Sequence, residues 1–111
     1  MGDVAKLDLL ANASCNGNNA ALAFTGTGFS SMVTGGVGIV VATLDPGLPG
    51  DNVTVAQSRV VATVTGGAGN ANIQVAKSVV AGQLTLTVTT FVGAVATNEA
   101  FDIEVYRDPS N

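Results

Sequence analysis

The sequence predicts an all-β fold, a single antiparallel β-sandwich or jelly-roll-like barrel that spans residues 1–111. Several short runs alternate hydrophobic and polar residues and are rich in Val, Ile and Thr, which is the period-2 pattern of half-buried strands. Breaks rich in Gly, Asn and Pro separate these runs about every 8–12 residues, a spacing typical of sandwiches and small barrels. The length of 111 residues suits one domain that buries about two thirds of its unfolded surface.

The first segment allows two interpretations. Val4, Leu7 and Leu10 share one face of a short N-terminal helix over residues 4–11, with Asp3 as its N-cap. The same residues form a first strand equally well, so both alternatives stay open. In either case we expect residues 1–11 to act as an arm that extends onto a neighbouring molecule.

Residues 83–90 and 99–107 show the clearest strand alternation. In the first run Leu84, Leu86 and Val88 are predicted to face one side and the intervening threonines the other. In the second run the inward residues are Phe101, Ile103 and Val105, and the outward residues are Asp102, Glu104 and Tyr106. Further strands are predicted at residues 19–25, 29–34, 52–57, 59–65 and 70–77. Residues 37–44 are apolar on both faces, which predicts a central strand covered from both sides.

The composition excludes several classes of function. The chain has no His and a single Cys, Cys15, so His-based triads, Cys–His pairs, ordinary zinc sites and an intrachain disulfide are impossible. The net charge of −4 argues against binding to nucleic acid or to an anionic membrane surface. No apolar run reaches the roughly 20 residues of a membrane span. We therefore predict no enzyme, no cofactor, and neither nucleic acid nor membrane as a partner.

The sequence offers three weak candidate sites: a calcium site, a pair of carboxylates and a sugar-binding site. Asp45, Asp51 and Asn52 flank the loop at residues 46–50 and offer oxygen ligands to Ca²⁺, but the alternating acidic pattern of a dedicated calcium loop is missing. The carboxylates of Asp102 and Glu104 are interpreted as a solubilising strand face. Sugar-binding modules stack their ligands on Trp or Tyr, and only Tyr106 is available. The phenylalanines are assigned to the core, namely Phe24, Phe29, Phe91 and Phe101.

The surface is predicted to be incomplete without a partner. Charged residues make up 11% of the chain, against about 25% in a typical soluble domain. Strands without charges leave edges that pair with further strands and faces that pack closely against a neighbour. We expect a homo-oligomer, preferably a trimer, with residues 106–111 as a second arm or tail. The predicted interface residues are Val4, Leu7, Leu10, Arg59, Val61, Tyr106 and Arg107.

In its size, its strands rich in Gly, Thr, Val and Ala, and its mild acidity, the whole chain resembles the small all-β virion proteins of tailed bacteriophages, in particular capsid cement or decoration proteins. The resemblance implies a structural protein on the outer surface of the capsid, made in the host cytoplasm, that bridges neighbouring capsid subunits. It transfers no site residues. A net negative charge suits an outer position, since a genome-facing protein needs a basic arm. The alternatives are a phage tail, fibre or neck component, and a stand-alone module that binds carbohydrate or calcium.

Overall fold

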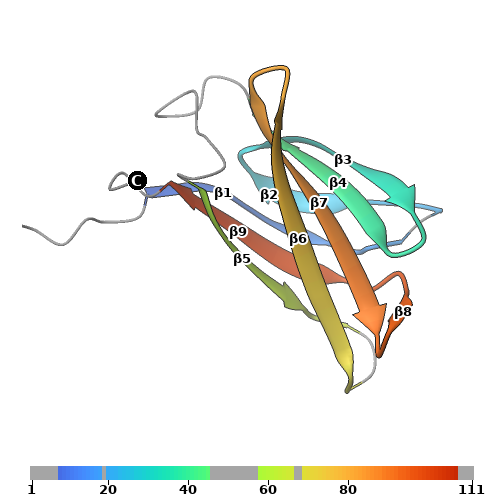
Figure 1. Cartoon of the computed structure of the whole chain (residues 1–111). Coiled ribbons are helices and arrows are strands. Elements are labelled where there is room, and N and C mark those ends of the chain that lie inside the picture. The colour runs from blue at the N-terminus through green and yellow to red at the C-terminus, as the bar shows by residue number, and fades with distance from the viewer. Residues whose placement is uncertain (1–7, 19, 46–57, 67–68, 108–111) are drawn as a thin grey trace, which may run out of the picture.

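The chain folds into two antiparallel β-sheets packed face to face, as the computed structural model in Figure 1 shows. The structure describes residues 8–18, 20–45, 58–66 and 69–107. Within these ranges the regular elements are nine strands, without a helix. This confirms the all-β prediction in its sandwich form. The predicted strand at residues 52–57 lies outside the described residues.

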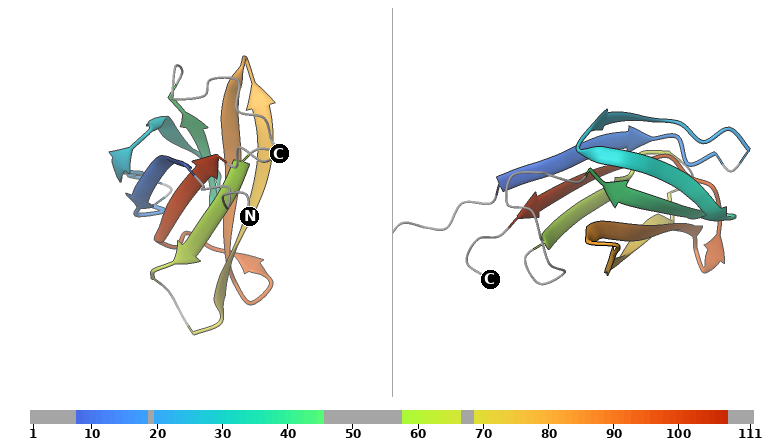
Figure 2. Two further views of the ribbon diagram at one scale, coloured as in Figure 1. Left: turned by 90° about the vertical axis from the view of Figure 1, so that its left-hand side faces the viewer. Right: turned by 90° about the horizontal axis from the view of Figure 1, so that it is seen from above.

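Each sheet joins pairs of consecutive strands to strands that are distant in sequence (Figure 2). Sheet A has the order β2 (Phe24–Thr27), β1 (Asp8–Cys15), β9 (Phe101–Arg107), β5 (Ser58–Val64). Sheet B has the order β3 (Phe29–Gly36), β4 (Ile39–Leu44), β7 (Gln83–Val92), β6 (Ala71–Val80), and β8 (Val95–Ala96) pairs with β7. The described ends of each sheet are therefore β2 and β5 in sheet A, and β3 and β6 in sheet B.

The core lies between the inner faces of the two sheets and follows the predicted alternation in β7 and β9. Its largest fully buried side chains include Phe101, Leu86 and Ile103. The complete set of buried hydrophobic residues is Leu10, Ala11, Ala13, Cys15, Phe29, Met32, Val40, Ala42, Leu44, Leu84, Leu86, Val88, Phe101, Ile103 and Val105. Phe91 was assigned to this core wrongly, because it lies on the outer side of β7 opposite Asn72.

Of the two alternatives for residues 4–11, the helix is wrong and the first strand is confirmed over residues 8–11, the part that the structure describes. Residues 8–11 belong to β1, which pairs with both β2 and β9. The register shifts between Leu9, opposite Tyr106, and Ala11, opposite Val105, so one extra residue bulges and Leu10 and Ala11 are both buried. The bulge interrupts the period of two in this part of β1. Backbone pairing on both sides outweighs the weak stability of so short a helix.

Both predicted arms are shorter than expected, because their inner parts are strand. Residues 8–11 lie within β1, so only residues 1–7 of the N-terminal arm remain, and these lie outside the described residues. Tyr106 and Arg107 end β9, where they pair with Arg59 and Ser58 of β5. The tail predicted over residues 106–111 therefore begins no earlier than residue 108, outside the described part of the chain.

The strand predicted over residues 37–44 is central but covered on one side only. It begins at Ile39 as β4, between β3 and β7. Val40, Ala42 and Leu44 are buried, whereas Ile39 and the other alternate residues of the strand stay half-exposed. No described residue forms a third layer over them. The expected cover on the second face is therefore absent from the described chain.

Of the strand predicted over residues 19–25 only Phe24 and Thr25 are strand, as the first half of β2, because an asparagine organises the loop before it. The Asn16 Oδ1 atom accepts hydrogen bonds from the backbone N–H groups of Asn18 and Ala23, both at 3.0 Å. The Asn16 amide also donates to the Ala21 carbonyl oxygen at 3.0 Å. Asparagine side chains commonly compete in this way with regular backbone pairing. The strand begins only at Phe24 as a result.

Replacing Ala81 by Asn is expected to raise the free energy of unfolding by about 0.5–1 kcal/mol. Ala81 and Gly82 form the two-residue turn between β6 and β7, and both have positive φ, +53° and +81°. A Cβ atom disfavours this region, which Asn tolerates better than Ala. Urea denaturation measures the change. Ala94→Asn in the β7–β8 turn is the control, because the φ of Ala94 is not positive. An equal gain there would contradict the explanation.

Candidate functional site

The outer face of sheet B carries no charged side chain among the described residues. The strand register aligns its side chains in rows across β3, β4, β7 and β6, for example Val33, Val41, Thr87 and Ala76. We call this surface the neutral face; its residues are Ser31, Val33, Ile39, Val41, Thr43, Asn72, Gln74, Ala76, Ser78, Thr85, Thr87, Thr89 and Phe91. The sequence predicted its central threonines as an outward row, but not the strands beside them.

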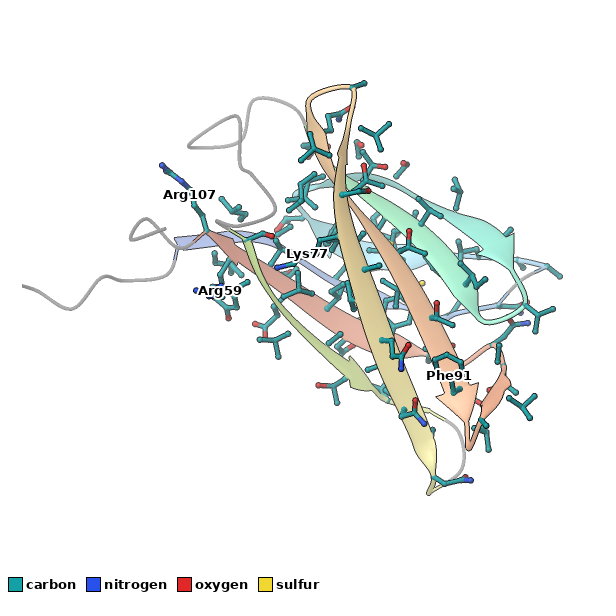
Figure 3. All side chains as sticks on the ribbon, viewed as in Figure 1. Arg59, Lys77, Phe91 and Arg107 are labelled. Carbon is teal, nitrogen blue, oxygen red and sulfur yellow. The ribbon has the colours of Figure 1, made fainter. Side chains whose placement is uncertain are left out.

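Lys77 is the single charged residue within β3, β4, β6 and β7, and it faces away from the neutral face. Its register partner on β7 is the fully buried Leu86. The Lys77 Nζ atom donates to the carbonyl oxygen of Ser58 on β5 at 3.0 Å (Figure 3). The ammonium therefore links the two sheets at one flank of the sandwich, where a groove of about 300 Å³ opens. The residues that line this groove are Val60, Ala62, Ile73, Val75 and Lys77.

The neutral face is smooth as well as uncharged. Most of its side chains are small hydroxyl, aliphatic or amide groups, and Val33 is 54% exposed. Gly35 adds no side chain to the β3 side of the face. A Cβ atom there would lie 2.9 Å from Cγ2 of Ile39, which is too close. Antiparallel sheets that face water usually alternate apolar inner residues with polar outer ones, among which charges are common. A four-strand face without any charge is suited to burial against another protein.

The end strands of sheet B lack most of the usual protection against further strand pairing. β6 is ten residues long, contains no proline, and pairs only with β7 among the described strands. Its only charge is Lys77, which points inward. β3 has neither charge nor proline. Sheet A is better protected, since β2 has only four residues and β5 carries Arg59.

The outer face of sheet A is different in character, because it is hollow and polar. A depression of about 370 Å³, which we call the polar trough, collects side chains from all four strands of the sheet. It is lined by Asn12, Ala13, Ser14, Thr25, Val61, Thr63, Asp102, Ile103 and Glu104. The Ser14 hydroxyl donates to Oδ1 of Asp102 at 2.7 Å. Asn12 and Ser14 were not predicted as site residues, because the strand order that brings them beside Asp102 and Glu104 is not encoded in the local sequence pattern.

The predicted interface residues divide between the outer face of sheet A and the interior. Arg59 lies opposite Tyr106, and Val61 lies opposite Glu104, so the three predicted residues Arg59, Val61 and Tyr106 share the outer face. Arg107 occupies an inward position opposite Ser58, and its buried Nε has no hydrogen-bond partner among the described residues.

Leu10 requires a correction, because it is only 7% exposed and belongs to the core. The bulge in β1 turns it inward, so Leu10 is not available to a partner surface. The other two predicted residues of the N-terminal segment, Val4 and Leu7, lie outside the described residues. Their interface role stays a prediction.

Tyr106 forms a hydrogen bond that alters its acidity. Its hydroxyl donates to Oε2 of Glu104 at 3.0 Å. This hydrogen bond raises the pKa of Tyr106 above its usual value, and burial and the negative charge of Glu104 act in the same direction. Because the folded-state pKa is raised, the interaction stabilises the fold below the unfolded-state pKa of about 10 and is lost as pH rises through the folded-state pKa.

Glu104→Gln is therefore expected to lower the midpoint of Tyr106 ionisation. Tyr106 is the only tyrosine and the chain has no tryptophan, so phenolate absorbance in an alkaline titration reports this residue alone. Asp102→Asn is the matched control, since Asp102 bonds to Ser14 rather than to Tyr106. Equal midpoints for the wild type and Glu104→Gln would show that the hydrogen bond does not control the ionisation.

The remaining chemical candidates do not assemble into a reactive site. Cys15 is buried, which raises the pKa of its thiol, although a hydrogen bond with the Gly17 backbone acts in the opposite direction. Asp45 follows β4 and donates its backbone N–H to the Gly28 carbonyl at 2.8 Å, whereas Asp51 and Asn52 lie outside the described residues. The described ranges hold no group of three His, Cys, Asp or Glu residues able to bind a metal ion.

Comparison of the chain with protein-family models, with curated proteins and with solved structures finds no match in any of the three. Among the described residues no helix is long and apolar enough to cross a membrane. The two outer faces, one neutral and smooth, the other polar and hollow, are thus the features from which function has to be inferred.

Proposed function

We propose that the chain is a non-enzymatic structural subunit of a virus particle, a cement or decoration subunit that stabilises the capsid by bridging neighbouring capsid subunits. The observation that carries this proposal is the neutral face, which spans four strands without a charged side chain among the described residues. Burying an unpaired charge in an interface costs several kcal/mol, and this face avoids that cost altogether.

The chemistry of the neutral face supports tight contact with a protein partner. Its valines and Ile39 contribute apolar area at about 25 cal/mol per Å². Its threonine and serine hydroxyls both donate and accept hydrogen bonds, so they can be satisfied by a partner's backbone after water is displaced. Small β-branched side chains also lose little rotamer freedom on binding.

The contrast in charge between the two faces supports one orientation. Asp102 and Glu104 lie on the outer face of sheet A, on the far side of the sandwich from the neutral face. With the neutral face against the capsid shell, these carboxylates point away from it. A net charge of −4 would be repelled by packaged nucleic acid, which favours a place outside the shell.

The unprotected ends of sheet B support association between copies of the chain. β3 and β6 both offer unguarded backbone on strands without outward charges. Strand pairing at these edges joins subunits without using the centre of the neutral face, which stays available to the shell. A small closed oligomer, with a trimer as the preferred size, would satisfy both surfaces.

The direct test combines light scattering with co-sedimentation on capsids purified from the same source. We expect an oligomer in solution and saturable binding to the particles. A monomer at high protein concentration that never sediments with capsids would overturn the proposal. Filaments formed by the protein alone would instead support the tail or fibre alternative, in which oligomerisation itself builds the shaft.

A further inference from the structure

We propose that the polar trough on sheet A is a binding site for a short oligosaccharide segment, a function that goes beyond capsid stabilisation. Its volume of about 370 Å³ falls within the usual range for small-ligand sites, about 300–1,000 Å³. Unlike most such sites it is lined mainly by hydroxyl, amide and carboxylate groups, so its ligand must be strongly polar. The neutral face and the trough lie on opposite sheets, which lets both be occupied together.

The trough has hydrogen-bonding capacity that the described chain does not use. The Asp102 carboxylate accepts from Ser14 through Oδ1, and the Glu104 carboxylate accepts from Tyr106 through Oε2. The second oxygen of each carboxylate accepts no hydrogen bond from the described residues. The side chains of Asn12, Thr25 and Thr63 likewise form none within the described ranges. Donors and acceptors are both left over, and a sugar hydroxyl needs both.

These groups are held in a fixed array by the sheet. Thr25, Ser14, Asp102 and Thr63 form one row across β2, β1, β9 and β5. Asn12, Glu104 and Val61 form the next row. Neighbouring strands lie about 4.8 Å apart, so each row presents evenly spaced polar groups on a rigid floor. Pre-organised groups bind more tightly, because little side-chain entropy is lost.

Val61 and Tyr106 supply the apolar surface that the C–H face of a sugar ring requires. Val61 is 51% exposed although it stands between polar neighbours. Tyr106 lies next to the trough, where its hydroxyl is fixed by Glu104. An aliphatic group and an aromatic ring can contact the C–H face of a sugar, while the polar row beside them binds its hydroxyl groups. A purely solubilising face has no need of an exposed valine at this position.

The same residues fit a cationic ligand less well. A metal ion needs a denser set of oxygen ligands, and the described residues hold no group of three acidic or other metal-binding side chains. A polyamine or basic peptide would use the two carboxylates but leave the donors of Asn12, Thr25 and Thr63 unmatched. Arg59, opposite Tyr106 on β5, also adds a positive charge at this end of the sheet.

The test is a titration of the full-length ¹⁵N-labelled protein with cellohexaose, maltohexaose and chitohexaose, followed by NMR. At least one of these is expected to shift the backbone amide signals of Asn12, Ser14, Thr63 and Asp102 with a Kd of about 1 mM or lower. Tyr106 fluorescence should change in parallel, because it is the only tyrosine and no tryptophan is present.

Asp102→Asn is expected to weaken oligosaccharide binding about tenfold, since a charged acceptor becomes neutral. The matched control is Gln74→Ala on the neutral face, which should leave the affinity unchanged. The NMR spectrum of each variant shows directly whether it is folded. Capsid co-sedimentation of Asp102→Asn should equal that of the wild type, so failure of the trough and failure of the proposed function are distinguishable.

Three results would overturn the proposal. In the first, none of the three oligosaccharides shifts the trough signals. In the second, spermine or CaCl₂ shifts them while the sugars do not, and Asp102→Asn abolishes the effect, which would identify a cation site instead. Shifts confined to the neutral face would equally count against a site in the trough.

Discussion

Gly28→Ala is expected to lower the free energy of unfolding by about 3 kcal/mol or more. Gly28 joins β2 to β3, at the point where the chain crosses from sheet A to sheet B, and its φ is +88°. A Cβ atom there would lie 2.4 Å from the Leu10 carbonyl oxygen and 2.6 Å from Cβ of Ala11. Both contacts belong to the bulged part of β1, where neighbouring backbone cannot easily move.

Gly69→Ala is the matched control for this prediction. A Cβ atom at Gly69 would have no neighbouring atom within 4 Å, and its φ is not positive, so the replacement should change stability by less than about 0.5 kcal/mol. Urea denaturation of both variants measures their free energies of unfolding, and these can be compared when the dependence on urea concentration is the same in both. Equal stabilities would mean that the crossover tolerates a side chain and that the close approach to β1 is not a constraint.

The local alternation of the sequence predicted much of the fold, but not its exceptions. The buried and exposed residues follow the expected period of two in β9 and in most of β7, where Thr85 is the exception because it is buried on the outward side of the strand. In β1 the bulge at Leu9–Ala11 shifts the phase, which depends on the partner strand and is invisible in the segment alone. Before β2 the Asn16 side chain accepts the backbone hydrogen bond of Ala23, so the strand begins only at Phe24.

The two candidate surfaces were harder to predict, because each combines strands that are far apart in sequence. Ser14 and Asp102 form a hydrogen bond across 88 positions of the chain. Their pairing depends on which strand lies beside which, and alternation does not encode strand order. For the neutral face the threonines of β7 were predicted as an outward row, yet their neighbours on β4 and β6 follow only from the register.

The distribution of charge links the fold to the proposed assembly. Within the strands of sheet B the described charge is Lys77, which is used internally to reach the Ser58 carbonyl of sheet A. The outer surface of sheet A instead holds Arg59, Asp102 and Glu104. Because no described charge lies on the neutral face, there is little electrostatic barrier to burying that face.

Thr87→Lys should abolish binding to capsids, with an affinity loss of at least about 100-fold. Thr87 lies at the centre of the neutral face, between Val41 on β4 and Ala76 on β6. A lysine there is solvated in the free subunit, so folding should change little. In the bound state its ammonium would be buried against the neutral groups of this face, which offer it no counter-charge. Because Thr87 is not on an end strand, the oligomer detected by light scattering should persist.

Thr27→Lys provides the same substitution at an exposed site on β2 of sheet A. It adds the same charge to the whole molecule, so any general electrostatic effect on capsid binding appears in both variants. Co-sedimentation with capsids and thermal melting of both proteins separate loss of binding from loss of folding. If Thr87→Lys and Thr27→Lys bound capsids equally well, the neutral face would not be the contact surface. A lysine ammonium buried at the centre of a real contact surface would weaken binding.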